Sequence, residues 1–233
     1  MNVLGIILGI LISLGSISSY IPQFYKIIKC KSVEGISEPS LILMNLSGLF
    51  LTMNSLIYSW TYILNKDISN LLPFMTIALS WLMVLVYYII FITYKIKKLE
   101  KRIISGLSYV FTYIIFIILI VALALGEKMK HNTDFFAIYA EILGISSAVL
   151  TCLIYIPQIY TLIKHKNNGN LSILMYILQT PGNAVIIFFQ AFIYDAKIST
   201  WITYLVSLVQ QTIILILMIY FYYKVNDIKL EEF

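Results

Sequence analysis

The sequence predicts an all-α integral membrane protein with seven transmembrane helices, arranged as two parallel three-helix repeats joined by a linker helix. Three observations predict this fold class. Of the 233 residues, 61% are hydrophobic and 12% are charged, whereas a soluble domain has about a quarter charged residues. The apolar residues form seven runs of spanning length, about 20 residues or more each. A twelve-residue segment also recurs 135 residues later.

Seven spans follow from the apolar runs between polar breaks. They are Val3–Ile28, Ser40–Tyr62, Leu71–Tyr94, Ile104–Leu125, Phe135–Ile163, Ser172–Tyr194 and Thr200–Tyr223. Connections of about 5 to 10 residues predict that consecutive helices alternate in direction and pack as neighbours. The first run continues past the length of a signal peptide and has no basic residue before it. We expect it to remain as a span.

Lysine and arginine residues set the predicted orientation. Twelve of them lie on one side of the membrane and four on the other, and the densest segment is KIKKLEKR after the third span. Because basic loops stay in the cytosol, the N-terminus is predicted to be lumenal or extracellular and the C-terminus cytosolic. We expect an endomembrane, such as the vacuole, lysosome or Golgi, with the plasma membrane as the alternative.

The internal repeat divides the chain. From Tyr20 it reads YIPQFYKIIKCK and from Tyr155 it reads YIPQIYTLIKHK, with eight of twelve positions identical. Three spans are an odd number, so an extra crossing is needed for the two copies to run in the same direction. The predicted division is residues 1–103 for the first repeat, 104–126 for the linker helix, and 127–233 for the second repeat with a short cytosolic tail.

The repeated Pro-Gln pairs are the predicted hinge or gating residues: Pro22 with Gln23, and Pro157 with Gln158. Each proline frees the carbonyl four residues earlier in its helix. In a membrane such a group needs a partner. The adjacent glutamine amides are well placed to help, and Ser16, Ser18, Ser19 and Thr151 are further local candidates. A kink in each half then acts as a hinge at the cytosolic end. The alternative is a static kink that only shapes packing.

The sixth span contains LQTPGN, in which Pro181 and Gly182 predict an interrupted helix. Broken spans at mid-membrane expose backbone groups to ligands, so this segment points to a binding site. The second span carries NLSG at the corresponding place. Aligning its glycine with Gly182 pairs Asn45 with Gln179, and the two amides are predicted to face each other between the halves.

Uncharged polar side chains lie near mid-depth of several spans, where buried amides usually face the bundle interior or a wet cavity. The candidates for the substrate pathway are Asn45, Asn54, Trp81, Gln179, Pro181, Asn183, Gln210 and Gln211. The alternative for each is a hydrogen bond between helices, worth about 1 kcal/mol. The neutral character of this layer favours a neutral or zwitterionic substrate.

Charged groups within the spans are scarce. Glu141 enters the fifth span near its lumenal end, which makes it either a proton relay or an interfacial residue. His131 and His165 fall in loops. The cysteines Cys30 and Cys152 have no metal-binding spacing around them, and nucleophile constellations and phosphate-binding loops are absent from the sequence. We therefore expect no enzyme activity, no cofactor and no metal site.

The duplicated Y-I-P-Q with its basic loop, followed by KSVEGIS at Lys31 to Ser37 and by NLSG, resembles the PQ-loop family. This group includes cystinosin-like amino-acid exporters, SWEET-type sugar transporters and endoplasmic-reticulum retention-signal receptors. The resemblance implies a three-one-three plan and a gating role for both Pro-Gln pairs. Span six lacks the aspartate that cystinosin-like members use in proton coupling, and Trp81 and Asn183 stand alone where SWEET-type members have pairs.

Two functions remain open on this resemblance. The first is a membrane transporter of a small polar solute, an amino acid or a sugar, that works by alternating access about the Pro-Gln hinges. The second is a non-transporting receptor or trafficking factor that uses the same cavity and its basic loops to bind cargo and coat proteins. The expected partners are a small-molecule solute and the lipid bilayer, without nucleic acid. Homo-oligomer formation is left open.

Overall fold

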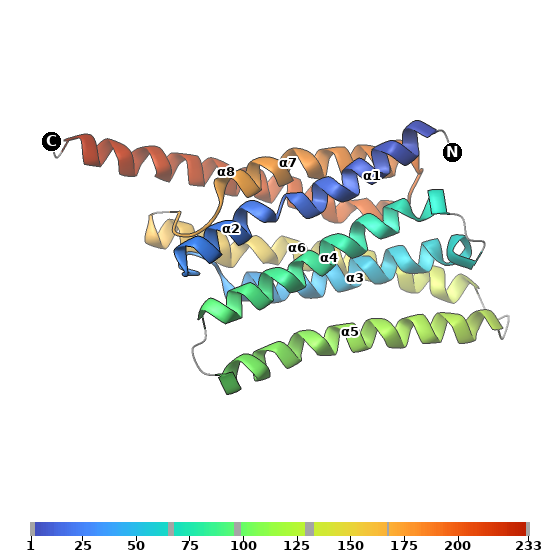
Figure 1. Cartoon of the computed structure of the whole chain (residues 1–233). Coiled ribbons are helices and arrows are strands. Elements are labelled where there is room, and N and C mark those ends of the chain that lie inside the picture. The colour runs from blue at the N-terminus through green and yellow to red at the C-terminus, as the bar shows by residue number, and fades with distance from the viewer. Residues whose placement is uncertain (1–2, 65–67, 96–98, 129–132, 167, 232–233) are drawn as a thin grey trace.

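The computed structural model describes residues 3–64, 68–95, 99–128, 133–166 and 168–231, and this part of the chain is helical with short connections (Figure 1). The helices are α1 Val3–Ser18, α2 Ile21–Cys30, α3 Glu38–Leu64, α4 Ile68–Lys95, α5 Leu99–Lys128, α6 Thr133–His165, α7 Ile173–Phe188, the π-helix η1 Phe189–Ile193, and α8 Ile198–Glu231. Residues 96–98 of the predicted basic segment, Lys130 and His131 lie outside the described residues.

Among the described residues, five helical segments are long and apolar enough to cross a membrane. They are Glu38–Trp60, Leu71–Lys95, Phe135–His165, Ile173–Ile193 and Ile198–Tyr223. The first predicted span is divided between α1 and α2, and α5 contributes the shorter apolar stretch Val110–Ala122. Large apolar side chains of α5, such as Phe111 and Ile118, are more than half exposed. Such a surface fits lipid, and the chain is a multi-pass membrane protein.

The neighbours of each helix correspond between the two halves of the chain. Helix α4 packs on both α1 and α3, and α8 packs on both α6 and α7. Helices α3 and α6 form the main contact between the halves, and α1 lies along α7. Helix α5 contacts α3 and α4 and runs along the outside of the bundle (Figure 1). The expectation that consecutive spans pack as neighbours is wrong for the first two spans of each half. Helices α1 and α3 are joined through α4, and α6 and α7 through α8, because the last helix of each half lies between the first two.

Small polar residues explain the close approach of α3 and α6. The Ser47 hydroxyl lies 2.9 Å from that of Ser147 and 2.7 Å from that of Thr151, and Ser147 donates in turn to the Ser47 carbonyl at 2.9 Å. A methyl group at Gly144 of α6 would lie 2.8 Å from Asn54 Nδ2 of α3. Small residues let helices approach closely where lipid offers no hydrophobic drive. This seam is therefore closed by direct contact.

The prolines act differently from one another. Helix α1 ends at Ser18, Ser19 and Tyr20 form a turn, and Pro22 lies in the first turn of α2, where its missing N–H costs nothing. In the second repeat Pro157 lies inside the continuous helix α6. The equivalent prolines thus divide one helix and leave the other whole.

The predicted interruption at Pro181 is also wrong. Helix α7 runs without a break from Ile173 to Phe188, and the irregular turn follows it at Phe189–Ile193 as a π-helix. A proline removes a single helical hydrogen bond, and in a membrane bundle neighbouring helices allow that loss without ending the helix. Gln179 and Asn183, one on each side of Pro181, are both hydrogen-bonded to Gln211 of α8, which holds α7 in place there.

Candidate functional site

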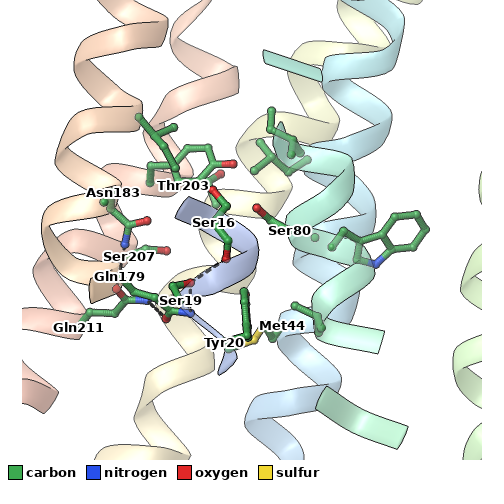
Figure 2. A pocket seen from close by; sticks show the side chains of 18 of the residues that line it. Ser16, Ser19, Tyr20, Met44, Ser80, Gln179, Asn183, Thr203, Ser207 and Gln211 are labelled. Carbon is green, nitrogen blue, oxygen red and sulfur yellow. Dashed lines mark hydrogen bonds between the residues drawn. The ribbon is translucent and has the colours of Figure 1, made fainter. Parts of the chain in front are cut away.

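A cavity of about 520 Å³ lies between the two halves of the bundle. Its lining residues come from α1, α3 and α4 of the first half and from α6, α7 and α8 of the second (Figure 2). None of these lining residues is Asp, Glu, Lys, Arg or His. A cavity of this volume is in the range of sites for small molecules, and its lining provides hydrogen-bonding groups without charge.

Three amides from the second half form the polar side of the cavity, and we call Gln179, Asn183 and Gln211 the amide cluster. Asn183 Nδ2 donates to Gln211 Oε1 at 2.9 Å. Gln211 Nε2 donates to the Tyr155 hydroxyl at 2.7 Å and lies 3.3 Å from Gln179 Oε1, and Gln179 Nε2 donates to Ser19 Oγ at 3.3 Å (Figure 2). The cluster thereby links α7, α8, α6 and the end of α1 across the centre of the molecule.

The opposite side of the cavity has no amide among its lining residues: it combines apolar side chains with hydroxyls such as those of Ser16 and Ser80, and Trp81 is its largest side chain. The indole stacks on Tyr113 with ring centroids 4.3 Å apart, and its Nε1 donates to Asn45 Oδ1 at 2.9 Å. A methyl group at Gly48 would lie 2.8 Å from the indole. Glycine at this position therefore leaves room for the indole between α3 and α4.

Some of the residues predicted for the substrate pathway line the cavity, and others do not. The cavity brings together Trp81, Gln179, Asn183 and Gln211. Pro181 is exposed and lies outside the lining, next to Gly182, which contributes to it. Gln210 donates to the Cys152 carbonyl at 2.7 Å and joins α8 to α6 instead of facing the cavity. For Gln210, the structure shows the interhelical hydrogen bond that was the alternative reading.

The two asparagines of α3 are also held by other helices. Asn45 Nδ2 donates to Thr112 of α5 at 3.1 Å, while its oxygen is taken by Trp81. The predicted pairing of Asn45 with Gln179 is therefore wrong, since both amides are bonded elsewhere. Asn54 is fully buried and donates to the Ala140 carbonyl at 2.7 Å, which ties α3 to α6.

Glu141 stands apart from the cavity. Its side chain is exposed on α6 and it is not among the lining residues. A role for Glu141 as a proton relay stays a prediction.

The glutamines of the two Pro-Gln pairs bind the loops of the opposite repeat. Gln23 Oε1 accepts from the Ser172 backbone N–H at 2.7 Å, and Gln23 Nε2 donates to the Asn170 carbonyl at 3.0 Å. Gln158 Oε1 accepts from the Ser37 N–H at 3.1 Å, and Gln158 Nε2 donates to the Gly35 carbonyl at 2.8 Å. We call these four hydrogen bonds the reciprocal clasp.

All three pairs of equivalent positions in the reciprocal clasp are 135 residues apart, so each glutamine makes the same contacts with the other half. Gln23 and Gln158 are both buried, with 0% and 4% of their surface exposed. The prediction that they satisfy the carbonyls freed within their own helices is wrong, because the opposite loop offers a complete donor and acceptor pair. Hinge or gate action remains a proposal.

The two clasped loops touch at glycines. Asn170 N–H donates to the Glu34 carbonyl at 2.8 Å. Gly35 and Gly169 both have positive φ, of 81° and 48°. A methyl group at Gly169 would lie 2.7 Å from the Glu34 carbonyl oxygen. The two glycines allow a backbone contact that a side chain would block.

Sequence reasoning missed Lys26. Its ammonium donates to the Gly169 carbonyl at 3.1 Å and to the Leu171 carbonyl at 2.6 Å. The equivalent residue is Thr161, whose hydroxyl bonds the Pro157 carbonyl of its own helix at 2.7 Å. The difference between lysine and threonine within the aligned repeat was the available signal. It gives one of the two loops an additional cationic partner.

A family model for the PQ loop repeat matches residues 4–64 and 139–200, which is more than half of the chain. The chain belongs to the PQ-loop repeat family. The two matched PQ-loop segments contain both Pro-Gln pairs and both clasped loops. Over 127 residues the chain is 31% identical to a fission yeast (Schizosaccharomyces pombe) protein described as uncharacterized protein C4C5.03, covering 54% of this chain and 39% of that relative's length.

Among solved structures, a eukaryotic SWEET transporter is similar in fold. The TM-score is 0.56 at 12% sequence identity, and the alignment covers 94% of this chain and 98% of the transporter chain. At 12% identity this similarity shows a shared fold over nearly the whole chain and no more.

Proposed function

We propose that this PQ-loop protein transports a small uncharged polar solute across a membrane by alternating access. The observation that supports the proposal best is a neutral cavity between two repeated halves, adjoined at one end by the reciprocal clasp. In this proposal the chain has a three-one-three plan, with α5 as the linker, and the Pro-Gln end faces the cytosol. The solute is an amino acid or a sugar, held by the amide cluster.

The reciprocal clasp serves as the cytosolic gate in this mechanism. Four hydrogen bonds at about 1 kcal/mol each hold the loops together with a free energy of roughly 4 kcal/mol. A difference of a few kcal/mol lets a minor open state exist, and a bound solute then shifts the balance. The first span is already divided between α1 and α2 at Ser19 and Tyr20, so rotation of α2 on that turn is the proposed opening motion.

The test is counterflow of labelled neutral amino acids, cationic amino acids and hexoses into proteoliposomes, with and without an acid-outside pH gradient. One solute class should be taken up, and Gln179→Leu and Asn183→Leu should each lower uptake about tenfold or more, because an unpaired buried polar group on a solute costs 1–3 kcal/mol. Gln210→Leu is the matched control, since this neighbouring amide lies outside the cavity.

The other outcomes redirect the proposal. Full uptake in the Gln179 and Asn183 variants would place the solute elsewhere. No uptake of any solute by folded protein would contradict transport and favour the receptor or trafficking function, to be followed by a search for bound cargo. A strict need for the pH gradient would give Glu141 a part in proton coupling.

A further inference from the structure

The two seams between the halves differ in how tightly they close. At the α3–α6 seam, hydroxyl contacts join the two helices, and a methyl group at Gly144 would lie only 2.8 Å from Asn54 Nδ2 of α3. At the α1–α7 seam, Gly15 and Gly182 stand in open space, with no atom within 4 Å of the position that a methyl group would take. The bundle is therefore closed on one side and loosely joined on the other.

Residues of the open seam line the cavity and are at the same time accessible from outside. Leu11, Gly15 and Ser18 follow the i, i+4, i+7 spacing on α1, and Leu178, Gly182 and Val185 follow it on α7. Leu11 is 58% exposed, Leu178 45% and Val185 50%. A row of side chains that both line the cavity and are exposed fits a cavity that reaches the outer surface of the bundle between α1 and α7.

The surface reached in this way faces lipid. Leu11 and Val185 lie within apolar helical stretches, α1 and Ile173–Ile193, so their surroundings in a membrane are acyl chains. Uncharged amides lie directly behind them, with Gln179 and Asn183 on the cavity side of α7 (Figure 2). The path from lipid to cavity thus changes from apolar to hydrogen-bonding without meeting a charged group among its lining residues.

We propose that the α1–α7 seam is a lateral portal that admits a single-chain amphiphile with a small uncharged polar head from the bilayer. The head binds the amide cluster, and the chain passes between Gly15 and Gly182 into the lipid. A charged head is disfavoured because its burial in a cavity without compensating charge is costly. The inference goes beyond the proposed function, since it requires a ligand to enter and bind but not to be moved.

The experiment is photo-crosslinking in lipid nanodiscs with 1-oleoylglycerol that carries a diazirine near its head. Crosslinks should map by mass spectrometry to residues 11–18 and 178–185 and should be competed by unlabelled 1-oleoylglycerol, but not by its phosphate monoester. Gly182→Leu fills the seam and should lower crosslinking about tenfold. Gly106→Leu on α5, where a side chain also meets open space, is the matched control.

The inference is overturned if crosslinks spread evenly over α5, or if Gly182→Leu leaves them unchanged. Should Gly182→Leu fail to fold, Gly15→Leu fills the same seam from α1. Counterflow measured on the same preparations separates this inference from the proposed function: crosslinking without any uptake supports the portal alone, and uptake without seam crosslinks supports transport alone.

Discussion

The reciprocal clasp and the cavity differ in how closely the two halves of the chain correspond. At the reciprocal clasp, Gln23 and Gln158 make the same pair of bonds to equivalent backbone atoms of the opposite half. At the cavity, the equivalence is lost. The amide cluster lies wholly in the second half, and the positions 135 residues earlier in the first half are Met44, Gly48 and Thr76.

This difference separates the contact that the two halves make with each other from the cavity, whose walls can contact a ligand instead. The reciprocal clasp has the same geometry in both places because both copies keep the glutamine and the loop backbone atoms that it bonds. A cavity that binds an asymmetric molecule gains from walls that differ, one polar and one apolar. The loss of equivalence leaves the cavity with amides on one side only, which suits a ligand whose two sides differ.

The largest expected effect comes from breaking the contact between the loops. Gly169→Val places a β-branched side chain at a positive φ and against the Glu34 carbonyl. We expect it to lower the free energy of unfolding by roughly 3 kcal/mol, measured by thermal unfolding in detergent. Gly106→Val, in open space on α5, should change it far less. Equal stability of the two variants would mean that the loops separate at no cost.

An intermediate effect tests whether the two glutamines are equivalent. Gln23→Leu should expose the Ser172 N–H and Gln158→Leu the Ser37 N–H, each leaving a buried group unpaired at a cost of about 1–3 kcal/mol. Hydrogen–deuterium exchange resolves the two loops separately. Each variant should speed exchange in the loop of the opposite repeat by a similar factor. Faster exchange confined to the variant's own repeat would contradict the reciprocal arrangement.

The smallest effect concerns the difference between the halves at the same end. Lys26→Met removes two hydrogen bonds to the loop of the second repeat, and we expect it to loosen that loop by about 1 kcal/mol. Exchange at the Asn170 N–H, which bonds the Glu34 carbonyl, reports the change. Thr161→Val should leave this exchange rate unaltered, because its hydroxyl bonds its own helix. Similar rates in both variants would show that Lys26 adds nothing to the clasp.

The features that depend on chain periodicity could be predicted from the sequence. Apolar runs located the helices, and the repeat located the residues of the clasp, with Ser37 and Ser172 already equivalent in the alignment. Trp81, Gln179, Asn183 and Gln211 were found because uncharged polar groups in a spanning helix face inward.

The remaining features depend on tertiary packing. Asn45 lies on the same helix as cavity residues, but the rotation of α3 and a nearby indole turn it toward α4 and α5. The continuity of α7 at Pro181 depends on the helices packed against it, and the local sequence around the proline does not reveal them. The roles of Lys26 and of the paired loop glycines need the two halves to be placed together before their partners are known.

The four hydrogen bonds of the reciprocal clasp are made to main-chain atoms of the loops and not to the loop side chains. Apart from the glycines that the contact between the loops requires, the loop residues between the equivalent lysine and serine can therefore differ between the repeats. Val33, Glu34 and Gly35 in one repeat correspond to Asn168, Gly169 and Asn170 in the other, without a single identity. Selection on the reciprocal clasp acts on the glutamine and on the conformation of the loop backbone. Distant members of the family should therefore keep the Pro-Gln pair even where their loop sequences can no longer be aligned.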